Sequence, residues 1–175
     1  MTRFGLANTV TSIRGLGGLG IVALFAWGSA IPVAAVATVC LILDGVDGRI
    51  ARRRNEVSRF GAWFDNETDA AITMVLCVGL LVFDVADWWV LAIGALRYLY
   101  LLAAVFLPPL RAPLPFSQVR RVIGLGQAIL LVVAILMAGL FPDLAADGRL
   151  AVLPAVGLLA LIWSFGRDTW HQLRA

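Results

Sequence analysis

Apolar segments of about 20 residues, the length of a helix that crosses a bilayer, make up most of this chain and restrict the folds open to it. Of the 175 residues, 61% are hydrophobic, and the mean hydropathy is +0.92, well above the usual values for a soluble domain. We therefore expect an all-α, polytopic membrane protein that forms a single domain over residues 1–175. The six expected membrane spans are Asn8–Trp27, Ile31–Arg52, Gly61–Phe83, Trp88–Leu107, Val119–Leu140 and Leu150–Phe165.

The charged residues between these spans indicate how the chain lies in the membrane. One set of connectors carries Arg3, Arg14, the Arg49 to Arg59 group, Arg111, Arg120, Arg121, Arg167 and Arg174. The opposite connectors carry aspartates and only Arg149. By the positive-inside rule, both termini are expected at the cytoplasmic face of a bacterial-type inner or plasma membrane. No nucleic-acid partner is expected.

A cluster of aspartates interrupts the apolar pattern at the end of the second expected span and the beginning of the third. Asp44 and Asp47 are three residues apart, and Gly61, Asp65 and Asp69 are spaced by four, so each set lies on one helical face. An aspartate at the centre of a membrane helix costs about 2.5–3.5 kcal/mol on insertion scales, so water, cations or partner charges must compensate for it. Two such faces turned together form a cage of oxygen ligands that suits Mg²⁺ or Mn²⁺.

The cluster follows the pattern D-x2-D-G-x2-A-R-x8-G-x3-D-x3-D, which resembles the signature of the CDP-alcohol phosphotransferase family. All eight fixed positions match, at Asp44, Asp47, Gly48, Ala51, Arg52, Gly61, Asp65 and Asp69. The first span also contains Asn8-x2-Thr11-x2-Arg14, similar to the N-x2-T-x2-R often found at the start of these proteins. Ala7 stands where a proline commonly precedes that asparagine.

The resemblance implies a metal-dependent transferase of phospholipid biosynthesis that uses two divalent ions. Asp44, Asp47 and Asp65 would be metal ligands, and Asp69 would complete the site and act as general base on the acceptor hydroxyl. Donor nucleotide or phosphate contacts are expected from Asn8, Thr11, Gly48, Ala51, Arg52 and Gly61. The glycines fit helix packing equally well, and Arg52 could instead anchor the membrane surface. The resemblance also implies a homodimer.

The expected reaction transfers a substituted phosphate group to an alcohol acceptor and releases CMP. CDP-diacylglycerol is the preferred donor, because its tails can stay in hydrocarbon, although a soluble CDP-alcohol remains open. Candidate acceptor-binding residues are Arg97, Arg111, Arg120 and Arg121. They suit glycerol 3-phosphate or an inositol phosphate, although Arg97 could be a structural ion pair and Arg111 and Arg120 could bind lipid headgroups. Arg121 with Gln127 resembles the basic residue and glutamine of family members that use phosphorylated acceptors, but Ile123 and Gly124 depart from that pattern.

A divalent-cation transporter or channel is the alternative function, because intramembrane aspartates also form permeation sites. It does not explain why glycines and Arg52 accompany the aspartates at this spacing. Helical spacing directs Asn66 and Glu67 away from Asp65 and Asp69, so neither is assigned to the site. Trp170 and His171 are expected in a polar C-terminal tail and receive no role.

Overall fold

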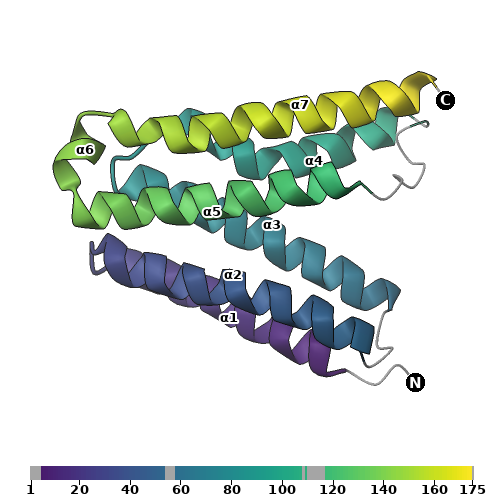
Figure 1. The fold of residues 1–175 in the computed structure, drawn as a ribbon, viewed down its shortest axis with the longest axis horizontal. Helices are drawn as coiled ribbons and strands as arrows, with labels where there is room; N and C mark the ends of the chain where they lie inside the picture. Colours follow the sequence, from purple (N-terminus) through teal and green to yellow (C-terminus); the bar gives the residue numbers. More distant parts are fainter. Residues whose placement is uncertain (1–4, 54–57, 108, 110–116, 175) are drawn as a thin grey trace.

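The structure, a computed structural model, describes residues 5–53, 58–107, 109 and 117–174, which form a helical bundle (Figure 1). The side chains of residues 47, 51–53, 171 and 173 lie outside this description. The elements are α1 (Leu6–Phe25), α2 (Ala30–Arg53), α3 (Arg59–Val82), η1 (Trp88–Val90), α4 (Leu91–Phe106), α5 (Gln118–Leu140), α6 (Pro142–Ala146), η3 (Arg149–Ala151) and α7 (Val152–Arg174). No strand occurs among the described residues, which confirms the all-α prediction.

Five helical segments of the described chain are long and apolar enough to cross a membrane, compared with the six predicted. These segments are Leu6–Phe25, Ala30–Ile50, Trp88–Phe106, Gln118–Leu140 and Arg149–Trp170. Helix α3 has 24 residues, but its first half carries Asp65, Glu67 and Asp69, which interrupt the apolar run. Two aspartates of the acidic cluster, Asp65 and Asp69, therefore lie in the helix that departs from the simple hydropathy pattern.

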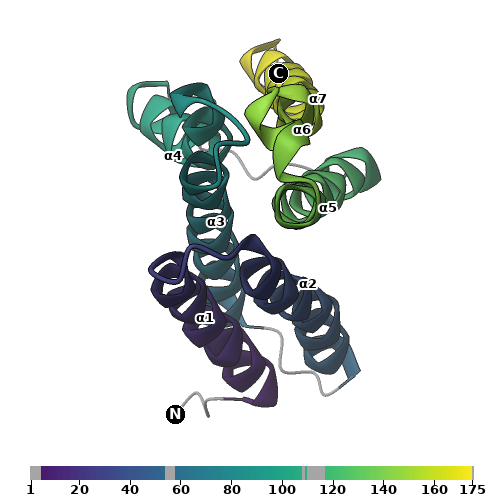
Figure 2. The same cartoon turned by 90° about the vertical axis from the view of Figure 1, so that its left-hand side faces the viewer.

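The long helices form two groups, which are joined by α3 and by the contact between α2 and α5. Helices α1 and α2 pack together, α5 and α7 pack together, and α4 contacts α7. Helix α3 packs against α1, α4 and α5, and it lies between the two groups when the bundle is viewed from its end (Figure 2). Both termini lie at the same end of the bundle (Figure 1), as the charge pattern predicts for a chain with an even number of spans.

The polar C-terminal tail predicted from the sequence is helical in the structure. Helix α7 continues from Val152 to Arg174 and therefore includes Trp170 and His171. The Arg174 guanidinium lies over the Trp170 ring, 3.8 Å from its centroid, and such cation–π contacts stabilise the last turns of a helix. Arginine near the carboxyl end also interacts favourably with the helix dipole.

Small residues allow the two helix groups to approach each other where α5 crosses the start of α2. A Cβ atom added to Gly139 would lie 2.7 Å from Ile31 Cγ1 and 3.1 Å from the Ile31 backbone nitrogen. The adjacent core contains Val33 and Ala34 from α2 and Ile135 from α5, all buried. Close approach through small residues is a common way to pack membrane helices.

We expect Gly139→Ala to destabilise the bundle by about 1–3 kcal/mol, because the added methyl group must push α5 away from α2. Thermal unfolding in detergent, followed by circular dichroism, measures this loss. Gly20→Ala is the control, since nothing lies within 4 Å of a Cβ atom at Gly20. Equal unfolding temperatures for Gly139→Ala and the control would show that the α2–α5 contact is not tight.

Candidate active site

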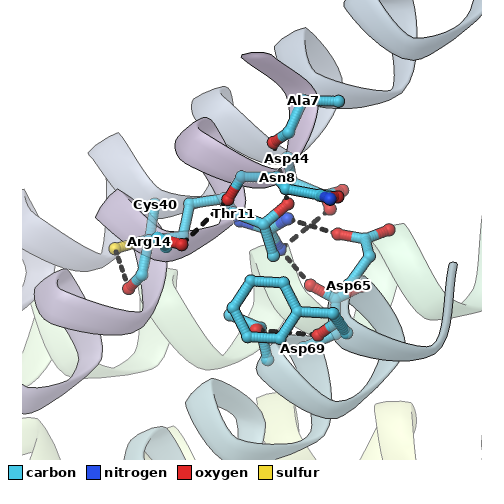
Figure 3. Close-up of polar contacts among 11 residues, drawn as sticks. Ala7, Asn8, Thr11, Arg14, Cys40, Asp44, Asp65 and Asp69 are labelled. Carbon is cyan, nitrogen blue, oxygen red and sulfur yellow. Dashed lines mark hydrogen bonds and ion pairs between the residues drawn. The ribbon is translucent and has the colours of Figure 1, made fainter. Parts of the chain in front are cut away.

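Three carboxylates from two helices meet at one end of the bundle. Asp44 lies in the C-terminal half of α2, and Asp65 and Asp69 lie one turn apart in the first half of α3. One oxygen from each carboxylate lies within 4.8 Å of the others (Figure 3). Asp47 is also in α2, but its side chain is outside the description. The oxygens are hard ligands at a spacing that could hold a divalent ion.

The cation that holds this cluster together comes from α1. Arg14 Nη1 lies 2.7 Å from Asp65 Oδ1, and Arg14 Nη2 lies 2.9 Å from Asp44 Oδ1 and is also bonded to Asp69 (Figure 3). The Arg14 side chain is only 2% exposed. The sequence interpretation counted Arg14 among the positive charges of a membrane face, and the structure corrects this to a buried ion pair. Its position inside a predicted span was the available signal, because intramembrane arginines are usually paired.

The predicted donor-side residues of α1 lie beside the cluster. Thr11 is buried and its hydroxyl donates to the Ala7 carbonyl oxygen at 3.2 Å. A Cβ atom at Gly61 would lie 2.9 Å from Asn8 Oδ1 and 3.1 Å from Ser58 Oγ, so glycine lets α1 approach the start of α3. Of the two explanations left open for Gly61, this contact favours helix packing.

The remaining donor-side candidates lie in the last turns of α2. Gly48, Ala51 and Arg52 are helical there, within two to three turns of Asp44. The side chains of Ala51 and Arg52 fall outside the described residues, so their contacts stay a prediction. The backbone alone is consistent with the one-face spacing expected from the motif.

A cavity of about 570 Å³ lies next to the cluster and is lined by residues from both helix groups. Asp44 and Asp69 contribute to one wall. The opposite wall includes Arg97 from α4 and Arg120 and Arg121 from α5, three of the four predicted acceptor residues. The fourth, Arg111, lies outside the described residues. Negative and positive side chains from helices distant in the sequence thus face a single space.

Two of these arginines already have acidic partners. Arg97 is bonded through Nη2 to Glu67 of α3, so the structural pair considered from the sequence is present, although with a glutamate. Arg120 Nη1 lies 2.9 Å from Asp168 Oδ2 of α7. These ion pairs hold two of the guanidiniums that line the cavity.

Two uncharged polar residues also line the cavity. Asn66, which helical spacing directed away from the site, is exposed on the same wall as Asp69. Gln127 of α5 is 4% exposed, and neither atom of its amide has a hydrogen-bond partner among the described residues. A buried amide without partners is costly, and a polar ligand in the cavity would satisfy it.

A carboxylate cluster and an arginine wall around one cavity between membrane helices are typical of enzymes that act on phosphorylated substrates. The family model for CDP-alcohol phosphatidyltransferase matches residues 4–165, so the chain belongs to this family. It is therefore a membrane transferase that moves a phosphatidyl or other substituted phosphate group from a CDP-alcohol to an alcohol. Comparison with curated proteins and with solved structures gave no match.

The Glu67–Arg97 pair gives a stability prediction. Glu67→Gln leaves the Arg97 charge without its partner, and with side chains 28% and 33% exposed we expect a loss of about 1–3 kcal/mol after solvent screening. The double variant Glu67→Gln/Arg97→Gln should recover most of that loss, since no unpaired charge remains. Thermal unfolding of the wild type, both single variants and the double variant gives a double-mutant cycle, which measures the interaction energy of the two side chains. Strictly additive losses would show that the two side chains do not interact.

Proposed function

We propose that this protein transfers the phosphatidyl group of CDP-diacylglycerol to a phosphorylated alcohol and releases CMP. Glycerol 3-phosphate and an inositol phosphate are the acceptors that its charges favour. The observation that carries the proposal is the cavity in which Asp44 and Asp69 face Arg97, Arg120 and Arg121. Carboxylates suit the metal-bound pyrophosphate of the donor, and arginine forks suit the phosphate of an anionic acceptor.

The proposed metal site consists of Asp44, Asp47, Asp65 and Asp69. The three described carboxylates fit Mg²⁺ or Mn²⁺, because they offer oxygen ligands within 4.8 Å of one another. Bound divalent ions, two in this proposal, neutralise charge on the oxygens of the reacting phosphate. The protein itself orients the donor through Asn8, Thr11 and the final turns of α2.

Asp69 is the proposed general base. Its carboxylate lines the cavity and its side chain is 46% exposed, so an acceptor hydroxyl can reach it from the arginine wall. Asp69 takes the hydroxyl proton, the acceptor oxygen forms a bond to the phosphorus that carries diacylglycerol, and the bond from that phosphorus to CMP breaks. CMP leaves with the electron pair of the broken bond.

The position of the aspartate cluster in the bundle favours a lipid donor over a soluble CDP-alcohol. Its helices reach the end of the bundle that carries both termini (Figure 1), and we propose that this end faces the cytoplasm. CDP-diacylglycerol could bring its head group to the aspartates while its tails stay beside the apolar helix surfaces. Family membership supports this transferase over the cation transporter considered above. We further propose that residues 1–175 act as a single membrane domain and that the protein is a homodimer, as the family resemblance implies.

A CMP-release assay tests the proposal. The purified protein in liposomes, with CDP-diacylglycerol, Mg²⁺ and single acceptors in turn, should release CMP only when the correct acceptor is present. Asp69→Asn should lower kcat by about 10²–10⁴-fold while donor binding is retained, because the general base is lost. A chelator should abolish the reaction, and added Mg²⁺ or Mn²⁺ should restore it.

Asp143→Asn provides the matched control, because this exposed aspartate lies in α6 at the opposite end of the bundle. Near-normal turnover of Asp69→Asn would remove Asp69 from its role. Acceptor-dependent CMP release from CDP-choline or CDP-ethanolamine with diacylglycerol, but not from CDP-diacylglycerol, would reverse the assignment of donor and acceptor.

A glycine of α7 allows a test of the acceptor side alone. A Cβ atom at Gly157 would overlap the Gln127 side-chain amide, so Gly157→Ala must push this amide toward the cavity. We expect the KM for the acceptor to rise about tenfold, the scale of one lost hydrogen bond, while metal dependence stays unchanged. Gly166→Ala on the same helix is the control, since nothing lies within 4 Å of its added Cβ. An unchanged KM would place the acceptor away from Gln127.

A further inference from the structure

The Arg14 guanidinium is the most enclosed part of the acidic cluster. Its side chain is 2% exposed, whereas those of Asp44, Asp65 and Asp69 are 35%, 38% and 46% exposed. The carboxylates are therefore more open to solvent than the cation, although Arg14 also lines the cavity. The Cys40 thiol also lies 3.8 Å from the Arg14 carbonyl oxygen, a contact that holds this turn of α1 against α2.

Each of the three carboxylates contacts Arg14. Arg14 is bonded to the Oδ1 atom of Asp44, of Asp65 and of Asp69 (Figure 3). An ionised carboxylate has two oxygens and about four lone-pair sites, so one oxygen can accept from a guanidinium while the other binds a cation. A planar, forked donor can hold several carboxylates in one arrangement, which a point charge cannot do.

A buried guanidinium does not leave such a site easily. Removing its partners would leave an uncompensated charge in the interior, which is strongly unfavourable. A divalent ion that arrives from the exposed side therefore meets carboxylates that are already held. The partial neutralisation by Arg14 also reduces the repulsion among three close negative charges.

We propose that Arg14 is a positioning residue that stays bonded to one oxygen of Asp44, Asp65 and Asp69 and turns the remaining oxygens toward the divalent ions. This inference rests on the proposed function, because it assigns these aspartates to the metal site. Arg14 acts through the carboxylates and does not contact the reacting phosphate. It connects α1 to α2 and α3, so one side chain sets the relative position of ligands from two helices.

Binding of Mn²⁺ alone, measured by electron paramagnetic resonance on the purified full chain in detergent, tests this role. Groups that orient metal ligands typically contribute 10–100-fold to metal affinity, so Arg14→Lys and Arg14→Gln should each bind Mn²⁺ at least about tenfold more weakly. Lysine keeps the positive charge but lacks the forked guanidinium, so the loss of Mn²⁺ affinity in Arg14→Lys measures the contribution of geometry. At saturating Mn²⁺ the CMP-release activity of Arg14→Lys should largely recover. An unfolded site would instead lose both its Mn²⁺ affinity and its activity at saturating Mn²⁺.

Two results would overturn the proposal. Tighter Mn²⁺ binding by Arg14→Gln would mean that Arg14 competes with the metal and is displaced by it. Wild-type affinity in Arg14→Lys would mean that Arg14 supplies charge and no positioning. Circular dichroism and size-exclusion chromatography check folding, and Arg14→Lys decides the question if Arg14→Gln does not fold.

Asp44→Asn separates this inference from the proposed function. Loss of Mn²⁺ binding in Asp44→Asn establishes that the measured site is the aspartate cluster, whatever reaction the protein catalyses. Wild-type protein that binds Mn²⁺ there but releases no CMP would refute the proposed reaction and leave the role of Arg14 intact. Wild-type protein with no Asp44-dependent binding would refute the role of Arg14 directly.

Discussion

The ion pairs between Arg14 and three aspartates are the interaction on which the candidate site depends. A guanidinium that is 2% exposed has lost nearly all its contact with solvent, and the carboxylates of Asp44, Asp65 and Asp69 compensate for that loss. The same contacts connect α1 to α2 and α3. The aspartates in turn repel one another unless a cation lies among them, so neither side of the cluster is stable alone.

The second constraint is the division of the bundle into two helix groups. Helix α3 belongs to both, since it packs against α1 on one side and against α4 and α5 on the other. Its first half carries Asp65 and Asp69 toward α1, while Glu67 reaches Arg97 of α4. The space between the groups is therefore lined by both acidic and basic side chains.

Much of this arrangement is encoded in local sequence patterns. Apolar runs of about 20 residues determine the helices, because that length is needed to cross a bilayer. Asp65 and Asp69 share a helical face because they are four residues apart. Family membership follows from the match over residues 4–165, which include the motif. Local patterns did not indicate that the polar end of the chain continues helix α7 to Arg174.

The sequence by itself determined the class of protein, the helical spans and the residues of the acidic motif, because each depends on spacing within one or two helices. Only the tertiary structure decided that Arg14 is buried among the aspartates, that Glu67 pairs with Arg97, and that Gln127 faces the cavity. These contacts join residues 30 to 55 positions apart or helices that are not consecutive. Helical periodicity reports which residues share a face, but the identity of the facing helix depends on how the whole bundle packs.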